Sequence, residues 1–253
     1  MGKKDSANAA PAAKTTQKTH LSKRFYQEVA IKDESGNGVA LLLDGKTVRT
    51  PGKAPLMLPT VKLAEAIAEE WRAQGERIDP ATMPLTKLAN SAIDGVRESE
   101  GAVIDDIMAH AGSDLLCYRA EGPKGLADAQ ATHWDPVLAW ARSALKAPLM
   151  VAEGIVHVAQ PEASLDAIKR RLQGLDAFRL AALHVMTQLT GSALLALAVA
   201  LQRLTPEEAW AAVHVDEDFQ ISQWGEDAEA AKRRAHRGRD FDAAAQMLRL
   251  LQG

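Results

Sequence analysis

The chain has 253 residues, a formal net charge of −3, and 47% hydrophobic against 25% charged residues. This composition is typical of a globular protein with a sizeable core and excludes a disordered chain. The near-neutral charge argues against binding to nucleic acid or an anionic membrane through a general basic field. The single cysteine, Cys117, excludes a disulfide framework and any metal site built from several thiolates of this chain.

Residues 1–20 are rich in Ala, Thr and Lys, have no large apolar residue after Met1, and predict a disordered tail. A secretory signal requires an apolar stretch of roughly 7–15 residues, which this tail lacks. The longest apolar run, Ala193–Leu201, is much shorter than the roughly 20 residues that cross a bilayer. We therefore expect a soluble protein without membrane contact.

Residues 21–80 predict a small, antiparallel β-rich domain that ends in one helix. Asp44-Gly45 stands between two strand-like runs, which is a strong signal for a two-residue hairpin. At Thr60, a good N-cap residue, the apolar period changes from two to about 3.6 residues, as in an amphipathic helix. Trp71 belongs to the apolar stripe of this helix, and we assign it as a structural anchor of the core.

Residues 81–253 predict a larger, all-helical C-terminal domain, so the expected fold class is α+β with the β-rich domain first. An acidic block followed by the basic cluster Lys232–Arg239 predicts a solvated, ion-paired helix. Apolar spacing and capping residues predict helices at Pro84–Val96, Val103–His110, Asp114–Tyr118, Ala127–Leu145, Pro161–Leu172, Ala177–Leu189, Ser192–Leu204, Pro206–Trp224 and Asp240–Leu251.

The sequence contains no established catalytic or metal-binding motif. The seven histidines are scattered, without a pair at the i, i+4 spacing of a helical metal site. A glycine-rich phosphate loop and a nucleophile elbow are also missing. We therefore predict no catalytic residue, no metal and no cofactor.

One predicted helix carries a carboxylate in the middle of an apolar stripe. If Pro206–Trp224 is continuous, a rotation of about 100° per residue places Glu217 on the same side as four apolar residues, Trp210, Val213, Ile221 and Trp224. A buried carboxylate is unfavourable unless it has a partner. Two explanations remain open: an internal salt bridge to an arginine of this chain, or a contact with an Arg side chain or backbone donors of another protein.

Seven stretches occur in unbroken order between about Arg24 and Arg234: Arg24-Phe25-Tyr26, Leu43–Pro51, Glu69–Gln74, Met83–Asp94, Asp114–Arg119, Trp134-Asp135-Pro136 and Asp216–Gly225. Together they resemble the assembly chaperones of the F-type ATP synthase catalytic head, specifically the family that binds the α subunit. The resemblance implies a non-catalytic chaperone that binds the free α subunit. It shields the surface that the α subunit presents to the β subunit, and it is displaced when the ring is built. We also expect the protein to be a monomer.

An acidic residue of the C-terminal domain is associated with function in this family, and the run before Phe219-Gln220 is the matching place. We assign this role to Glu217, with Asp216 as the alternative, and expect Trp210, Gln220 and Trp224 to bind the partner with it. Mitochondrial members carry a targeting extension. The tail has no arginine, which favours the bacterial cytoplasm, or the mitochondrial matrix if the tail is a targeting sequence.

A second hypothesis is an enzyme whose acid–base site is assembled from dispersed residues. Glu217, His214 and His184 are the candidate groups. His214 and Glu217 are three positions apart on one predicted helix and therefore share a face.

Overall fold

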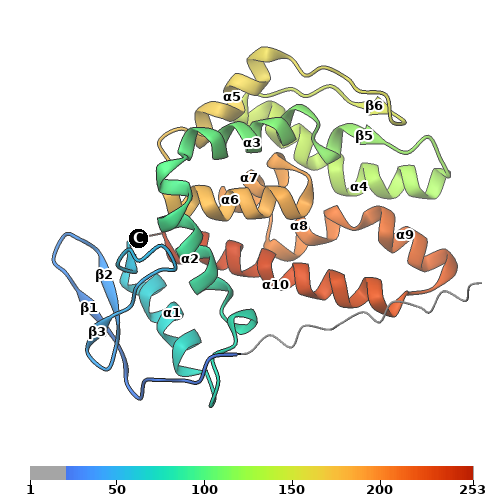
Figure 1. Ribbon diagram of the computed structural model, residues 1–253. Coiled ribbons are helices and arrows are strands. Elements are labelled where there is room, and N and C mark those ends of the chain that lie inside the picture. Colours follow the sequence, from blue (N-terminus) through green and yellow to red (C-terminus); the bar gives the residue numbers. More distant parts are fainter. Residues whose placement is uncertain (1–20, 253) are drawn as a thin grey trace, which may run out of the picture.

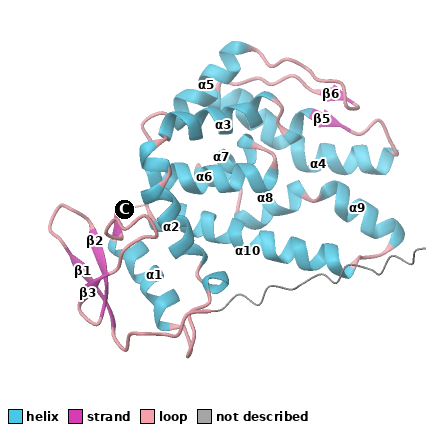
Figure 2. Ribbon diagram, in the orientation of Figure 1, coloured by secondary structure: helices cyan, strands magenta, loops and turns pink. Residues whose placement is uncertain are grey.

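The structure is a computed structural model that describes residues 21–252, and it confirms the α+β class. A small sheet with one helix lies at one end of the molecule, and the other helices form the bulk (Figure 1). The strands gather at that end, apart from a short pair in the helical part (Figure 2). The predicted tail lies outside the described residues.

The sheet consists of β1 (Val29–Asp33), β2 (Val39–Leu43), β3 (Lys46–Thr47) and β4 (Met57–Leu58). The central strand is β2, which pairs antiparallel with the other three. The predicted hairpin is confirmed, because Asp44 and Gly45 have φ angles of 47° and 76° and connect β2 to β3. Positive φ at both positions is what a type I′ turn requires.

Helix α1 (Val61–Arg72) covers the sheet, and its N-cap is Thr60, as predicted. The Thr60 hydroxyl accepts a hydrogen bond from the Leu63 amide at 3.1 Å and donates one to the Leu250 carbonyl at 2.9 Å. The second bond ties α1 to the end of α10 (Ala228–Leu250). Trp71 is half-buried, and its ring lies 5.5 Å from that of Tyr26, so the structure places it at the edge of the core.

Eight further helices follow α1 and precede α10. Helix α7 is the most deeply buried, because every residue from Ala193 to Val199 is buried. It packs on α6, which in turn contacts α2, α3 and α10 (Figure 1). These eight helices are α2 (Pro84–Asp94), α3 (Glu100–Gly112), α4 (Lys124–Trp140), α5 (Glu162–Leu172), α6 (Ala177–Thr190), α7 (Ala193–Ala200), α8 (Pro206–Val213) and α9 (Val215–Trp224).

A buried carboxylate, Asp114, holds the start of α7. Its Oδ1 accepts from the Leu116 amide and its Oδ2 from the Leu194 amide, both at 3.1 Å. The first bond caps a 3₁₀ turn, Leu115–Cys117, and the second satisfies an amide that the first turn of α7 leaves without a helical partner. Burial raises the pKa of Asp114 to about 6.

One hydrophobic cluster extends from Leu41 in the sheet to Leu248 in α10. It runs through α1 and α2, so the helical part and the β-rich part share core contacts. The division of the chain at residue 80 stays a prediction. Within residues 21–252, every helix is too short or too polar to span a bilayer.

The predicted helix Pro206–Trp224 is wrong, because the chain breaks into α8 and α9 at His214. His214 has φ −103° and ψ 14°, and its ring Nδ1 lies 2.8 Å from the Trp210 carbonyl, one of those that the end of α8 leaves open. Asp216, Glu217 and Asp218 then occupy the first turn of α9, where negative charge stabilises a helix N-terminus. The capping box of Thr205 and Glu208 at the start of α8 is present.

Three other predicted helices differ from the structure. The predicted helix Ser192–Leu204 ends at Ala200, and residues 201–204 form a turn. Asp114–Tyr118 is the 3₁₀ turn followed by a strand, β5 (Tyr118–Arg119), which pairs in parallel with β6 (Ala152–Glu153). Helix α10 begins at Ala228 rather than Asp240, because Asp227 caps it by accepting from the Ala230 amide at 2.7 Å. The basic cluster is therefore part of α10.

Candidate functional site

A groove separates α9 from the first turns of α10. Gly225, whose φ of 86° favours glycine, joins the two helices and lets α10 fold back beside α9. The hollow between them measures about 230 Å³. Its lining includes Glu217, Gln220, Ile221 and Trp224 of α9 and Ala230, Ala231 and Arg234 of α10. The structure thus brings together three of the predicted partner-binding residues: Glu217, Gln220 and Trp224.

The three consecutive acids of α9 point to three different surroundings, because successive helical residues are about 100° apart. Asp216 turns toward α4, where its Oδ1 accepts from Gln130 Nε2 at 2.7 Å. Asp218 forms a two-pronged ion pair with the guanidinium of Arg234. Of the three acids only Glu217 lines the groove, so the geometry favours it over Asp216 as the acid of this site.

Glu217 has charged and polar neighbours but no hydrogen bond to either of them. Its Oε2 lies 3.7 Å from His214 Nε2 and 3.9 Å from Arg234 Nη1, and both distances exceed a normal hydrogen bond. The side chain of Glu217 is 36% exposed. An internal ion pair with Arg234 therefore exists at long range, and the carboxylate still has free acceptor positions in the groove.

The electrostatics of these neighbours leave the charge of Glu217 only partly balanced. Burial lowers the pKa of His214, so its imidazole is neutral at pH 7 and carries no charge to offset the carboxylate. The hydrogen bonds that Arg234 donates to Asp218 raise the pKa of Arg234, so its guanidinium stays charged but is held by Asp218. The site therefore presents a net negative charge.

The apolar part of the site is Trp224, a residue that is 80% exposed at the end of α9. Large exposed aromatic rings beside charged groups are typical of protein-binding surfaces. The prediction that Trp210 shares a helix face with Trp224 is wrong, since the break at His214 separates them. Trp210 instead packs against α10, with its ring 5.1 Å from that of Phe241.

Sequence reasoning missed Arg234 as the cation of this site. The basic cluster was visible in the sequence, but only the packing of α10 on α9 determines which of its arginines reaches Asp218. Phe219, on the opposite side of α9, is closely packed against α4. A Cβ atom added at Gly125 would lie 3.3 Å from its ring.

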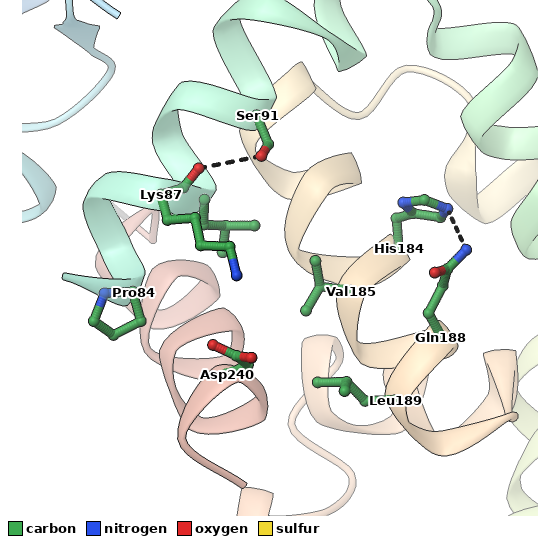
Figure 3. Close-up of a pocket in the computed structure, with 9 residues that line it drawn as sticks. Pro84, Lys87, Ser91, His184, Val185, Gln188, Leu189 and Asp240 are labelled. Carbon is green, nitrogen blue, oxygen red and sulfur yellow. Dashed lines mark hydrogen bonds between the residues drawn. The ribbon is translucent and has the colours of Figure 1, made fainter. Parts of the chain in front are cut away.

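The residues of the enzyme hypothesis do not form one site. His184 lies on α6, where its Nε2 is 2.7 Å from Asp106 Oδ2. It lines a separate hollow of about 220 Å³ between α2, α6 and α10, opposite Lys87 and Asp240 (Figure 3). Among residues 21–252, no group of three or more His, Cys, Asp or Glu side chains is placed to hold a metal ion.

A family model described as the ATP12 chaperone protein matches residues 23–142. The chain is also 47% identical to a putative chaperone from Agrobacterium tumefaciens, with a TM-score of 0.89 over 92% of this chain and 87% of that one. Atp12 from Paracoccus denitrificans is 43% identical, with a TM-score of 0.87 over 91% of this chain and 99% of that one. The chain belongs to the ATP12 chaperone family.

A solved mutant of the Paracoccus Atp12 is equally similar, with 43% identity and a TM-score of 0.86 over 90% of this chain and 97% of that one. Membership of the ATP12 family confirms the resemblance that the seven sequence stretches indicated. The likeness to solved structures also extends well beyond residue 142, where the family model ends.

Proposed function

We propose that this protein is an assembly chaperone of the F-type ATP synthase catalytic head and binds the free α subunit through the groove between α9 and α10. Membership of the ATP12 family supports the chaperone role. The observation that carries the choice of site is Glu217, a half-exposed carboxylate with free acceptor positions beside the exposed ring of Trp224. The chaperone acts as a monomer in the bacterial cytoplasm.

The groove suits a partner surface that offers both a donor and an apolar side chain. A guanidinium or backbone amide of the α subunit donates to Glu217, and the contact gains strength as water leaves the groove. Trp224 supplies apolar area with little loss of side-chain freedom. Contacts of this kind at the centre of an interface dominate its binding free energy.

Shielding follows from where this contact lies on the α subunit. A free α subunit exposes the surface that the β subunit covers in the finished catalytic ring. Large exposed apolar surfaces promote aggregation. The chaperone covers part of that surface. The β subunit displaces it because the permanent interface between ring subunits buries more area.

The test is co-expression with the isolated α subunit or the isolated β subunit, followed by affinity capture and size determination. We expect a soluble one-to-one complex with α only. Capture of neither subunit, or of β in place of α, contradicts the proposed function.

A charge reversal, Glu217→Lys, tests the site. We expect loss of capture of the α subunit with a nearly unchanged melting temperature. The matched control is Glu229→Lys, which makes the same change of charge at an exposed position of α10 outside the groove. If both variants bind as the wild type does, the groove is not the site.

A further inference from the structure

The groove does not end at Arg234. A second hollow of about 380 Å³ lies further along α10 and shares Glu226, Ala231 and Arg234 with the first. Its other walls include Trp210, Gly238, Arg239 and Asp242. From Ala230 to Asp242, the two hollows follow α10 for roughly 18 Å at the usual helical rise. They form one continuous surface, which we call the α10 groove.

Gly238 is unexplained by the fold of α10. It stands in the interior of the helix, where glycine is disfavoured relative to alanine, and its φ is not positive. The three heavy atoms nearest to a Cβ atom added there all belong to the Trp210 ring, at 3.6 to 3.7 Å, which is an ordinary contact. Because neither the backbone nor the packing requires a glycine, its effect is to leave the edge of the Trp210 ring uncovered.

Trp210 is a rigid platform beneath this opening. Its ring lies 4.3 Å from that of His214 and 5.1 Å from that of Phe241, which is fully buried. The indole Nε1 is 3.7 Å from the position that a Gly238 Cβ would take. We call the opening between Gly238 and the Trp210 ring the slot. Within residues 21–252 the indole nitrogen has no hydrogen-bond acceptor, so it can donate to a carbonyl group placed in the slot.

The charges of the α10 groove select the kind of segment that fits it. Four carboxylates line it, and of its two arginines Arg234 is already held by Asp218. At the far end, Asp242 forms no ion pair with any described residue, and burial and the nearby charge of Glu207 raise its pKa. The four carboxylates are those of Glu217, Glu226, Asp227 and Asp242.

We propose that the α10 groove, between its two ends at Trp224 and Asp242, binds one continuous segment of the α subunit. Basic side chains of that segment contact the carboxylates of the groove, and an apolar side chain lies in the slot over Trp210. This inference rests on the proposed function and specifies the partner chemistry. The slot at Gly238 is the position where the segment packs most closely against the chaperone.

The experiment fills the slot with Gly238→Leu in the full-length chain and titrates it with the isolated α subunit. Leucine is a better helix former than glycine, so the variant folds at least as stably as the wild type. We expect affinity for the α subunit to fall about tenfold. The control is Gly101→Leu, at an exposed helical glycine with nothing within 4 Å of its Cβ position, and it binds normally.

A second variant, Asp242→Lys, tests the charge requirement. It places a cation beside Glu207, so we expect no loss of folding, a severalfold weaker complex and a smaller dependence of the affinity on salt. Glu229→Lys again serves as the control with the same change of charge.

The outcomes separate the two proposals. If the wild type fails to bind the α subunit, the proposed function fails. If the wild type binds and Gly238→Leu binds equally well, only the extended groove is overturned. If Gly238→Leu changes the self-association of the chain but not its affinity for the α subunit, the occupant of the groove is a second copy of this chain. That result also overturns the inference.

Discussion

Asp114 and Glu217 are both carboxylates at the N-terminus of a short helix, α7 and α9 respectively, yet their surroundings are opposite. Asp114 is fully buried and accepts amide hydrogen bonds from Leu116 and Leu194. Glu217 is 36% exposed, and its nearest donors are beyond hydrogen-bond distance. The helices differ in the same sense, since seven residues of α7 are buried and only Val215 of α9 is.

The same chemical group therefore stabilises the fold at Asp114 and remains free to bind a partner at Glu217. In the core, a carboxylate without donors would be strongly destabilising, so Asp114 is surrounded by them. At the surface, an acid that keeps free acceptor positions costs little stability and remains available to a partner. Variants at the two positions should therefore separate loss of stability from loss of binding.

The largest expected effect is that of Asp114→Ala on stability. The substitution leaves two buried amides without acceptors and opens a cavity, so we expect the free energy of unfolding to fall by about 3 to 5 kcal/mol. Urea unfolding followed by circular dichroism measures it. A loss below about 1 kcal/mol would show that water replaces the carboxylate and that Asp114 does not hold α7.

A pH titration gives a somewhat smaller effect at the same residue. The native pKa of Asp114 is raised from 3.8 to about 6, so between these values the folded state binds more protons than the unfolded chain. The contribution of Asp114 to stability is therefore full below about pH 4 and falls by on the order of 3 kcal/mol as pH rises through 6. The difference in unfolding free energy between wild type and Asp114→Ala should decrease over this range, and a constant difference would refute the prediction.

The smallest expected effect on stability is that of Glu217→Gln. This change removes the charge and keeps the shape, and the ion-pair distances of 3.7 and 3.9 Å are long, so we expect a change within about 0.5 kcal/mol. Affinity for the α subunit should nevertheless decrease. A large loss of stability would instead show that Glu217 forms a structural ion pair with Arg234, as Asp218 does.

Local features of the fold were predictable from the sequence because they depend on neighbouring residues. The hairpin at Asp44-Gly45, the N-cap Thr60 and the capping box at Thr205 belong to this group. The break at His214 was not predictable, since the apolar spacing continues through it and the ring's bond to the Trp210 carbonyl is a feature of the folded turn. The β5–β6 pair also joins residues that are far apart in the sequence.

The site was predictable to the same extent. Glu217, Gln220 and Trp224 lie on one short helix, so their common surface follows from the helical period. Which of the three adjacent acids is left without a hydrogen-bond partner depends on Gln130 and Arg234, which belong to α4 and α10. The position of Trp210 depends on packing against Phe241 of α10. Helical spacing relates only residues of one helix, so it could not predict this contact.

The most direct test of the central claim is photo-cross-linking from single positions in the presence of the isolated α subunit. One variant carries a photoreactive phenylalanine analogue in place of Trp224, and the other carries it in place of Ile155, which is 99% exposed in the loop after β6. Both positions are exposed and apolar, so general stickiness affects them alike. We expect cross-links to the α subunit from position 224 and only background levels of cross-linking from position 155. Equal cross-linking from both positions, or cross-linking from position 155 alone, would contradict it.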